Sequence, residues 1–330
     1  MVLLCMVMEI GVSHMIDRDI DKNRGARARR RGLKRDHVQE STYRVIRKLA
    51  RVGGILDRAM GSAEARERVA QPLFRVATAL SAMSMACAKV VSLKDQPALK
   101  ARIWLMLFGE TCTGKSSSLE TLHDLDLGTR RAWQDRVTFQ LHSNLWVIKR
   151  SIDRDDGILV VDCDSLMAMA FAKYAADPKG GSGPGASMCG VHMLARPYTL
   201  READPLPSEM IVFTATDKLF PGESSMKATP EIDQALLDLV IRWRTLQNQI
   251  VLEPTEAAME MMEDEPEEKA ANLARVAMLF AADSIISPAS LPEGATSPIT
   301  TDHLDAAKLV LSTATPVSEV QRPHPKRRGR

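Results

Sequence analysis

An eight-residue loop flanked by glycines, Gly109–Ser116, limits what this chain can fold into more than any other feature of its sequence. The loop reads GETCTGKS; an apolar run, Arg102–Phe108, precedes it, and a helical pattern over Ser117–Leu127 follows it. Glycines let such a loop curl so that successive backbone N–H groups point at phosphate oxygens, and the positive end of the following helix faces the same anion. The order of strand, loop and helix therefore predicts a phosphate-binding loop, in preference to an ordinary turn rich in Gly, Ser and Thr.

The positions of this loop have expected contacts with a bound nucleotide, which we expect to be ATP with Mg²⁺. Lys115 would reach the β- and γ-phosphates, and Ser116 would place its hydroxyl on the metal ion. The residues expected to surround the phosphates are Gly109, Glu110, Thr111, Cys112, Thr113, Gly114, Lys115, Ser116 and Ser117.

A second apolar run, Ile158–Val161, ends in Asp162 and supplies a candidate metal ligand. Asp162 lies 47 residues after Lys115 and would hold Mg²⁺ through water. Any buried strand can end in an aspartate, so this motif is less specific than the loop. The side chains of successive strand residues alternate between the two faces of a sheet, so Asp164 can lie on the same face as Asp162. Asp164 is either the general base or a cap for the following helix.

A third apolar run, Met210–Phe213, is followed by the polar residues Thr214 and Thr216. Short buried runs that are separated by helical stretches and end in polar residues are typical of a parallel sheet covered by helices. We therefore predict an α/β fold: a P-loop NTPase with a mostly parallel central sheet flanked by helices, and with helical N-terminal and C-terminal segments. Thr216 is expected either to bond the γ-phosphate or the attacking water, or to cap a helix.

The cations of the chain are unevenly distributed, although its net charge is only +2. Lys22–Arg35 holds eight Lys and Arg residues, Arg322–Arg330 holds five, and neither stretch contains an acid, so the rest of the chain is acidic. Basic arms of this kind contact nucleic-acid phosphates or serve as solubilising tails. Because Lys22–Arg35 has no aromatic residue, we expect phosphate contacts with DNA and no base stacking.

Composition and periodicity divide the chain into five segments. Apolar residues recur at helical spacing before Gly53–Gly54, and again over residues 63–91, where Pro72 would break or kink the helix. The predicted segments are a disordered basic arm (1–36), a helical segment (37–100), an ATPase core (101–250), a C-terminal helical segment (251–315) and a basic tail (316–330).

Disulfide-rich, zinc-binding and membrane proteins are disfavoured. The five cysteines are far apart and none has a close partner at metal-ligand spacing. No stretch reaches the ~18 apolar residues needed to span a bilayer. The apolar residues 1–12 lack a basic region before them and a cleavage site after them, so they do not read as a signal peptide. We expect a cytoplasmic protein without a membrane partner.

At the level of these motifs, the chain resembles the P-loop ATPase domain of primase-helicase-type proteins of phages, plasmids and integrated elements. The resemblance covers roughly residues 65–313. Its matched segments, in order, are the buried helix 73–92, IWLMLFGETCTGKS, FQLHSNLWVIKRSIDRDDGILVVDCDSL, MIVFTATDKLF, EEKAANLARVAMLFAAD and ITTDHLDAAKLV. The resemblance implies a helicase-like motor that forms a homo-oligomeric ring and works on DNA.

The resemblance also implies roles for single residues. Ring motors complete their site with an arginine from a neighbouring subunit. The candidates are Arg242, Arg244 and Arg275, of which Arg275 lies in the most similar segment; each is otherwise a surface arginine with a packed stem. Cys163 stands where the family usually has a Glu that orients the attacking water, which favours slow hydrolysis. A nucleotide-binding switch or assembly factor therefore stays an alternative, as does a small-molecule kinase, although the loop 177–187 lacks the arginines of a kinase lid.

Overall fold

In the computed structural model, the described residues are 39–65, 71–97, 99–109, 113–115, 118, 120–122, 124, 125, 128, 158–162, 190–195, 210–215, 233–292 and 294–320. The chain divides into two compact units, Met1–Thr42 and Tyr43–Arg330, and every element named below belongs to the second unit. The predicted disordered arm (1–36) and the basic stretch Arg322–Arg330 lie outside the described residues.

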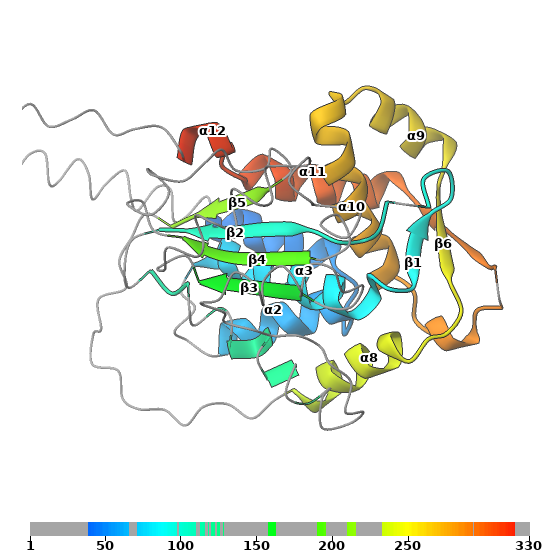
Figure 1. Cartoon of the computed structure of the whole chain (residues 1–330), viewed down its shortest axis with the longest axis horizontal. Coiled ribbons are helices and arrows are strands. Elements are labelled where there is room, and N and C mark those ends of the chain that lie inside the picture. The colour runs from blue at the N-terminus through cyan, green and yellow to red at the C-terminus, as the bar shows by residue number, and fades with distance from the viewer. Residues whose placement is uncertain are drawn as a thin grey trace, which may run out of the picture. The chain divides into compact units, whose positions relative to one another are not determined.

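The second unit contains a four-stranded parallel sheet. Its strands are β2 (Trp104–Phe108), β3 (Ile158–Asp162), β4 (Gly190–Ala195) and β5 (Ile211–Thr214), in the order β3-β4-β2-β5 (Figure 1). The three apolar runs of the sequence thus form β2, β3 and β5. The structure confirms the prediction that the protein combines helices and strands and contains a parallel sheet.

Strand β4, which lies between β2 and β3, was not predicted from the sequence. Its six residues, GVHMLA, begin with glycine and include His192, so they form no continuous apolar run. Pairing with a strand on each side gives β4 its hydrogen bonds, and these depend on the tertiary fold rather than on local composition.

Helix α3 (Pro72–Cys87) packs against the strands of this sheet and against α2 (Ile55–Ala65). All residues of α3 except Arg75 are buried, as its almost wholly apolar or small composition predicts. Pro72 occupies the first turn of α3, where its missing N–H costs no hydrogen bond. The predicted helix therefore begins anew at Pro72, but it ends at Cys87 and not at Val91.

A second sheet, which the sequence analysis did not predict, has three parallel strands in the order β1-β6-β7. These strands are short: β1 (Val91–Leu93), β6 (Ile250–Pro254) and β7 (Thr296–Ile299). The segments predicted to be helical thus also contribute strands. The helices around them are α8 (Gln234–Arg244), α9 (Glu256–Glu263), α10 (Glu267–Asp283), the short 3₁₀ turn Pro288–Ser290, α11 (Thr301–Thr313) and α12 (Val317–Val320).

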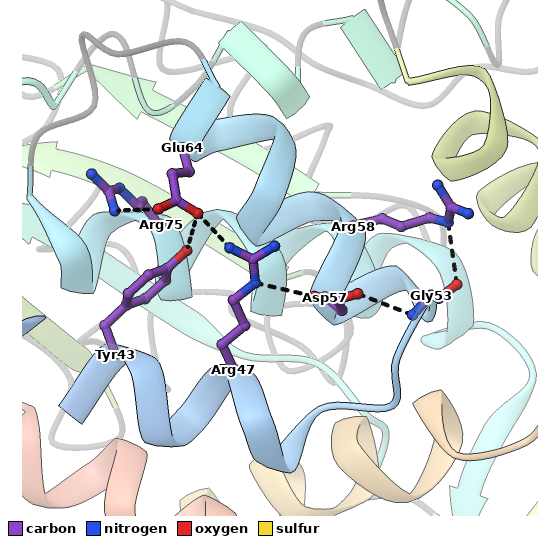
Figure 2. Close-up of polar contacts among 7 residues, drawn as sticks. All are labelled: Tyr43, Arg47, Gly53, Asp57, Arg58, Glu64 and Arg75. Atoms are coloured by element: carbon purple, nitrogen blue, oxygen red, sulfur yellow. Dashed lines mark hydrogen bonds and ion pairs between the residues drawn. The ribbon is translucent and has the colours of Figure 1, made fainter. Parts of the chain in front are cut away.

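A network of ion pairs fixes the helical residues 43–49 to α2 and α3 (Figure 2). The Glu64 carboxylate accepts a hydrogen bond from the Tyr43 hydroxyl at 3.2 Å and pairs with the guanidinium groups of Arg47 and Arg75. Arg47 Nε also lies 3.1 Å from Asp57 Oδ1. Burial, reinforced by the charge of Glu64, raises the pKa of the Tyr43 hydroxyl. One side of this helix is therefore held against the core.

The carboxylate of Asp283, the last residue of α10, lies at the start of α2. Its Oδ1 accepts a hydrogen bond from the backbone N–H of Leu56 at 3.3 Å, and the Arg51 side chain donates to its backbone oxygen. A side chain at Gly54 would put a Cβ 2.6 Å from the Asp283 carboxylate oxygens, so any other residue there would displace this buried carboxylate. Asp283 is 2% exposed, and its Oδ2 has no hydrogen-bond partner among the described residues. Burial raises the pKa of Asp283 to about 6.

This raised pKa predicts a stability that falls as the pH rises. The folded protein binds the Asp283 proton more tightly than the unfolded chain, so this contribution is largest below the ordinary pKa of 3.8 and is lost as the pH rises to about 6. A shift of this size corresponds to something on the order of 2–3 kcal/mol. Asp283→Asn should keep the bond to Leu56 and remove the titration. We expect the variant to gain stability over the parent protein between pH 4 and pH 7, measured by urea unfolding; a stability difference that is constant across this range would contradict the prediction.

Candidate nucleotide-binding site

The predicted phosphate loop begins at the carboxyl end of β2, a central strand of the first sheet. Because all four strands are parallel, their carboxyl ends meet at one edge of the sheet. In this register, Phe108 pairs with Ala195 of β4 and with Thr214 of β5, while Asp162 pairs with Leu194. The loop and Asp162 therefore lie at the same edge, where ligands of parallel sheets bind.

Two glycines shape the described part of the loop. Gly114 has a φ of +84°, in the left-handed region that favours glycine. At Gly109, a Cβ would lie 2.9 Å from Thr113 Oγ1 and 3.2 Å from the backbone oxygen of Ala215. The loop can therefore close on itself and on the end of β5 only with glycine at position 109. Both glycines of the predicted motif thus have a steric reason for their identity.

The Lys115 side chain folds back over this loop. Its Nζ donates to the backbone oxygen of Gly109 at 2.7 Å, and Thr113 Oγ1 lies 3.4 Å away. The lysine is only 8% exposed, and Thr113 is buried. A buried ammonium is stable only among oxygen acceptors. The loop thus holds a cation beside its own backbone, at the place where the sequence predicts phosphate oxygens.

The loop is anchored to the core through Ser118. The Ser118 backbone N–H donates to Gly114 O at 3.1 Å, and its hydroxyl donates to Lys115 O at 2.6 Å. The Ser118 backbone oxygen in turn accepts from the hydroxyl of Thr78, in the middle of α3, at 2.9 Å. Further along, Ser62 of α2 and Thr121 approach within 3.5 Å through their hydroxyls. Helices α2 and α3 thus fix the position of the loop relative to the sheet.

Asp162 is the last residue of β3, and β4 separates β3 from β2. Two strand spacings, about 10 Å, therefore lie between the backbone of Asp162 and that of the strand before the loop. The metal ligand predicted from the sequence therefore lies one strand further from the loop than an adjacent strand would put it.

The end of β5 is clamped by a segment that the sequence analysis did not connect with the site. The backbone N–H of Thr315 donates to Val212 O at 2.8 Å, and the Thr315 hydroxyl lies 3.0 Å from that of Thr214. On the other side of β5, the Ala215 N–H donates to Phe108 O at 2.9 Å. Thr214 therefore contacts Thr315 through its hydroxyl. The two residues lie 101 positions apart, so no local sequence pattern indicates this contact.

Of the remaining predicted site residues, the structure describes the three arginines, and the others lie outside the described residues. Arg275 is half-buried in α10, which packs against α11, α3 and β7. Arg242 is exposed, and the Arg244 guanidinium donates to the backbone oxygen of Met85 at 2.9 Å. Those that lie outside the described residues are Glu110, Thr111, Cys112, Ser116, Ser117, Asp164 and Thr216.

Searches for known relatives give no family assignment: no family model matches the chain, and no curated protein matches it. In the described part of the chain, no helix is both long and apolar enough to cross a membrane. Over the same residues, no group of three or more His, Cys, Asp and Glu side chains is placed to hold a metal ion.

Proposed function

We propose that the chain is a P-loop NTPase that binds ATP with Mg²⁺ in the loop Gly109–Ser117. One observation carries the proposal: Lys115 is buried inside a glycine-shaped loop, at the carboxyl end of a central parallel strand, with its ammonium bonded to loop oxygens. These are the oxygens that phosphate oxygens would replace on binding. The close approach at Gly109, which a Cβ would block, supports the same reading.

The residues of the proposed site have distinct tasks. Lys115 pairs with the β- and γ-phosphates, and the loop N–H groups surround them. Ser116 and Asp162 would hold the Mg²⁺, which would supply positive charge to the phosphate oxygens. The position of Asp162 at the carboxyl edge of the sheet, level with the loop, supports this assignment.

The reaction we propose is ATP hydrolysis coupled to DNA, in a helicase-like motor of a mobile element. This part of the proposal rests on the resemblance of the sequence to the primase-helicase-type ATPases and on the two basic stretches. Asp164 would act as the general base, Thr216 would orient the γ-phosphate or the water, and Arg275 would act on the site of a neighbouring subunit in a homo-oligomeric ring.

A second candidate function is a nucleotide-binding switch or assembly factor that hydrolyses ATP slowly or not at all. Cys163, at the position of the family's usual Glu, favours it. A small-molecule kinase is the third candidate and has no specific observation in its support.

The ATPase rate with and without single-stranded DNA tests the choice between these functions. A motor should hydrolyse ATP faster when DNA is bound, because DNA binding rearranges the active site into its catalytic form. We expect at least a severalfold stimulation, with the particle mass measured in the same buffer with ATP. A rate that is independent of DNA would favour the switch and exclude the motor.

The basic stretches make a separate prediction. Deleting residues 1–35 and 321–330 removes fourteen Lys and Arg residues: Arg18, the eight of Lys22–Arg35 and the five of Arg322–Arg330. If these cations neutralise phosphates, DNA affinity should fall, and its dependence on salt should become flatter. Fluorescence anisotropy over a salt series measures both quantities. The same affinity and the same salt slope in the truncated protein would show that the stretches are only solubilising tails.

A further inference from the structure

The outer side of the helical residues 43–49 carries large apolar side chains that the core does not cover. Val45 and Leu49 are exposed one turn apart, and Val52, in the following loop, is 90% exposed. The cations Arg44 and Lys48 lie exposed beside them. The buried residues of this helix, with Tyr43 and Arg47 of Figure 2, hold its opposite side against α2 and α3.

A fourth apolar residue extends this surface. Ile286 is 73% exposed and lies three residues beyond the end of α10. The bond from Arg51 to the Asp283 backbone and the contact of Asp283 with Leu56 bring the two loops together. We name this surface the basic apolar face; it consists of Arg44, Val45, Lys48, Leu49, Val52 and Ile286.

Helix α9 presents a surface of the opposite charge. Glu256, Glu260 and Glu263 recur at spacings of four and three residues, so they share one side of the helix, and Met259 is exposed beside them. Ala258 faces the core instead. None of the three glutamates forms an ion pair within the described part of the chain. We name Glu256, Met259, Glu260 and Glu263 the acidic apolar face.

The two faces lie at opposite ends of α10. Helix α9 leads into its first residue, Glu267, whereas the basic apolar face adjoins its last residue, Asp283. A helix of 17 residues is about 25 Å long. A single folded chain therefore cannot bring its own two faces together, but the faces of two chains can meet.

We propose that the basic apolar face of one copy of this chain binds the acidic apolar face of the next copy. The basic apolar face offers four exposed apolar side chains and the acidic apolar face offers one, Met259, and burial of these side chains favours association. The charges of the two faces are complementary. The contact joins two different surfaces, so it is heterologous. A row of bound copies therefore has a free basic apolar face at one end and a free acidic apolar face at the other. Repeated contacts of this kind close into a ring or continue as a filament. The proposal does not depend on nucleotide binding.

Charge reversal tests the contact in the full chain without nucleotide. Arg44→Glu with Lys48→Glu reverses one face, and Glu256→Lys with Glu260→Lys reverses the other. Each double variant alone should associate about tenfold or more weakly than the parent, because like charges then meet. An equal mixture of the two variants, or all four substitutions in one chain, should restore association. Sedimentation velocity over a dilution series measures the dissociation constants.

Control variants reverse one charge of each sign at exposed sites outside both faces: Lys89→Glu and Asp305→Lys. These should associate as the parent does, and circular dichroism should show all variants folded. The proposal is wrong if the parent sediments as a monomer at every concentration, if the reversed variants associate like the parent, or if the mixture fails to associate. It is also wrong if reversing Arg44 and Lys48 weakens DNA binding and leaves self-association unchanged, since the face then takes nucleic acid.

Discussion

Replacing Lys115 by alanine should lower the affinity of the protein for ATP–Mg²⁺ by about a hundredfold or more. Charge-assisted hydrogen bonds contribute roughly 1.5–3 kcal/mol each, and two phosphate groups are expected to bond this ammonium. No neighbouring cation of the described loop residues can take its place, because Gly109, Thr113 and Gly114 are neutral.

The physical reason lies in the bonds that Lys115 makes without nucleotide. Its Nζ contacts Gly109 O and Thr113 Oγ1, both of which belong to the loop itself. Nucleotide binding at the proposed site would exchange these neutral acceptors for charged phosphate oxygens, which form stronger hydrogen bonds with an ammonium. The bonds through which Ser118 anchors the loop use backbone atoms of Gly114 and Lys115, so alanine at position 115 preserves them.

Isothermal titration calorimetry measures the affinity, and thermal unfolding verifies that the variant is folded. Lys308→Ala is the matched control: it removes a lysine of α11 that pairs with Glu265 at 3.1 Å, and it should bind ATP like the parent. Equal ATP affinity in folded Lys115→Ala and in the parent would refute the proposed site.

The parts of the fold that the sequence predicted are those with strong local patterns. The strands β2, β3 and β5 are apolar runs, of which β3 ends in Asp162 and β5 in Thr214. Helix α3 is a long apolar helix that begins at a proline. In contrast, β4 contains Gly190 and His192, and β1 has only three residues. Such strands are defined by their pairing partners, which lie far away in the sequence.

In the candidate site too, the features with a local sequence pattern were predicted and those formed by distant segments were not. The glycines and Lys115 follow from the motif, because the loop geometry is local and needs particular residues at fixed offsets. The anchoring bond from Thr78 to Ser118 and the clamp of Thr315 on β5 join distant segments, so no pattern in the sequence indicates them. The buried Asp283 was likewise unpredicted, since a helix-ending aspartate is ordinarily exposed.

Replacing Asp164 by asparagine should reduce the ATP hydrolysis rate by roughly 10²–10⁴-fold, the range for a positioned general base. Asp164 lies outside the described residues, and the expectation comes from the sequence. An attacking water needs an acceptor in line with the γ-phosphate. Cys163 is a poor base there, because the flanking Asp162 and Asp164 disfavour the thiolate. In the sequence, Asp164 is then the first carboxylate after Asp162, the proposed metal ligand.

Two substitutions, each compared with the parent, decide between a weak base and a helix cap at this position. Asp164→Asn should still bind ATP–Mg²⁺, because Asp162 and the loop remain, so calorimetry separates lost chemistry from lost binding. Cys163→Glu should raise the hydrolysis rate, since it restores a carboxylate at the position where the resembling family usually has one. Phosphate release under saturating ATP measures both rates. If Asp164→Asn hydrolyses ATP as fast as the parent, Asp164 is only a helix cap, and the acceptor for the water must come from another residue or from a neighbouring subunit.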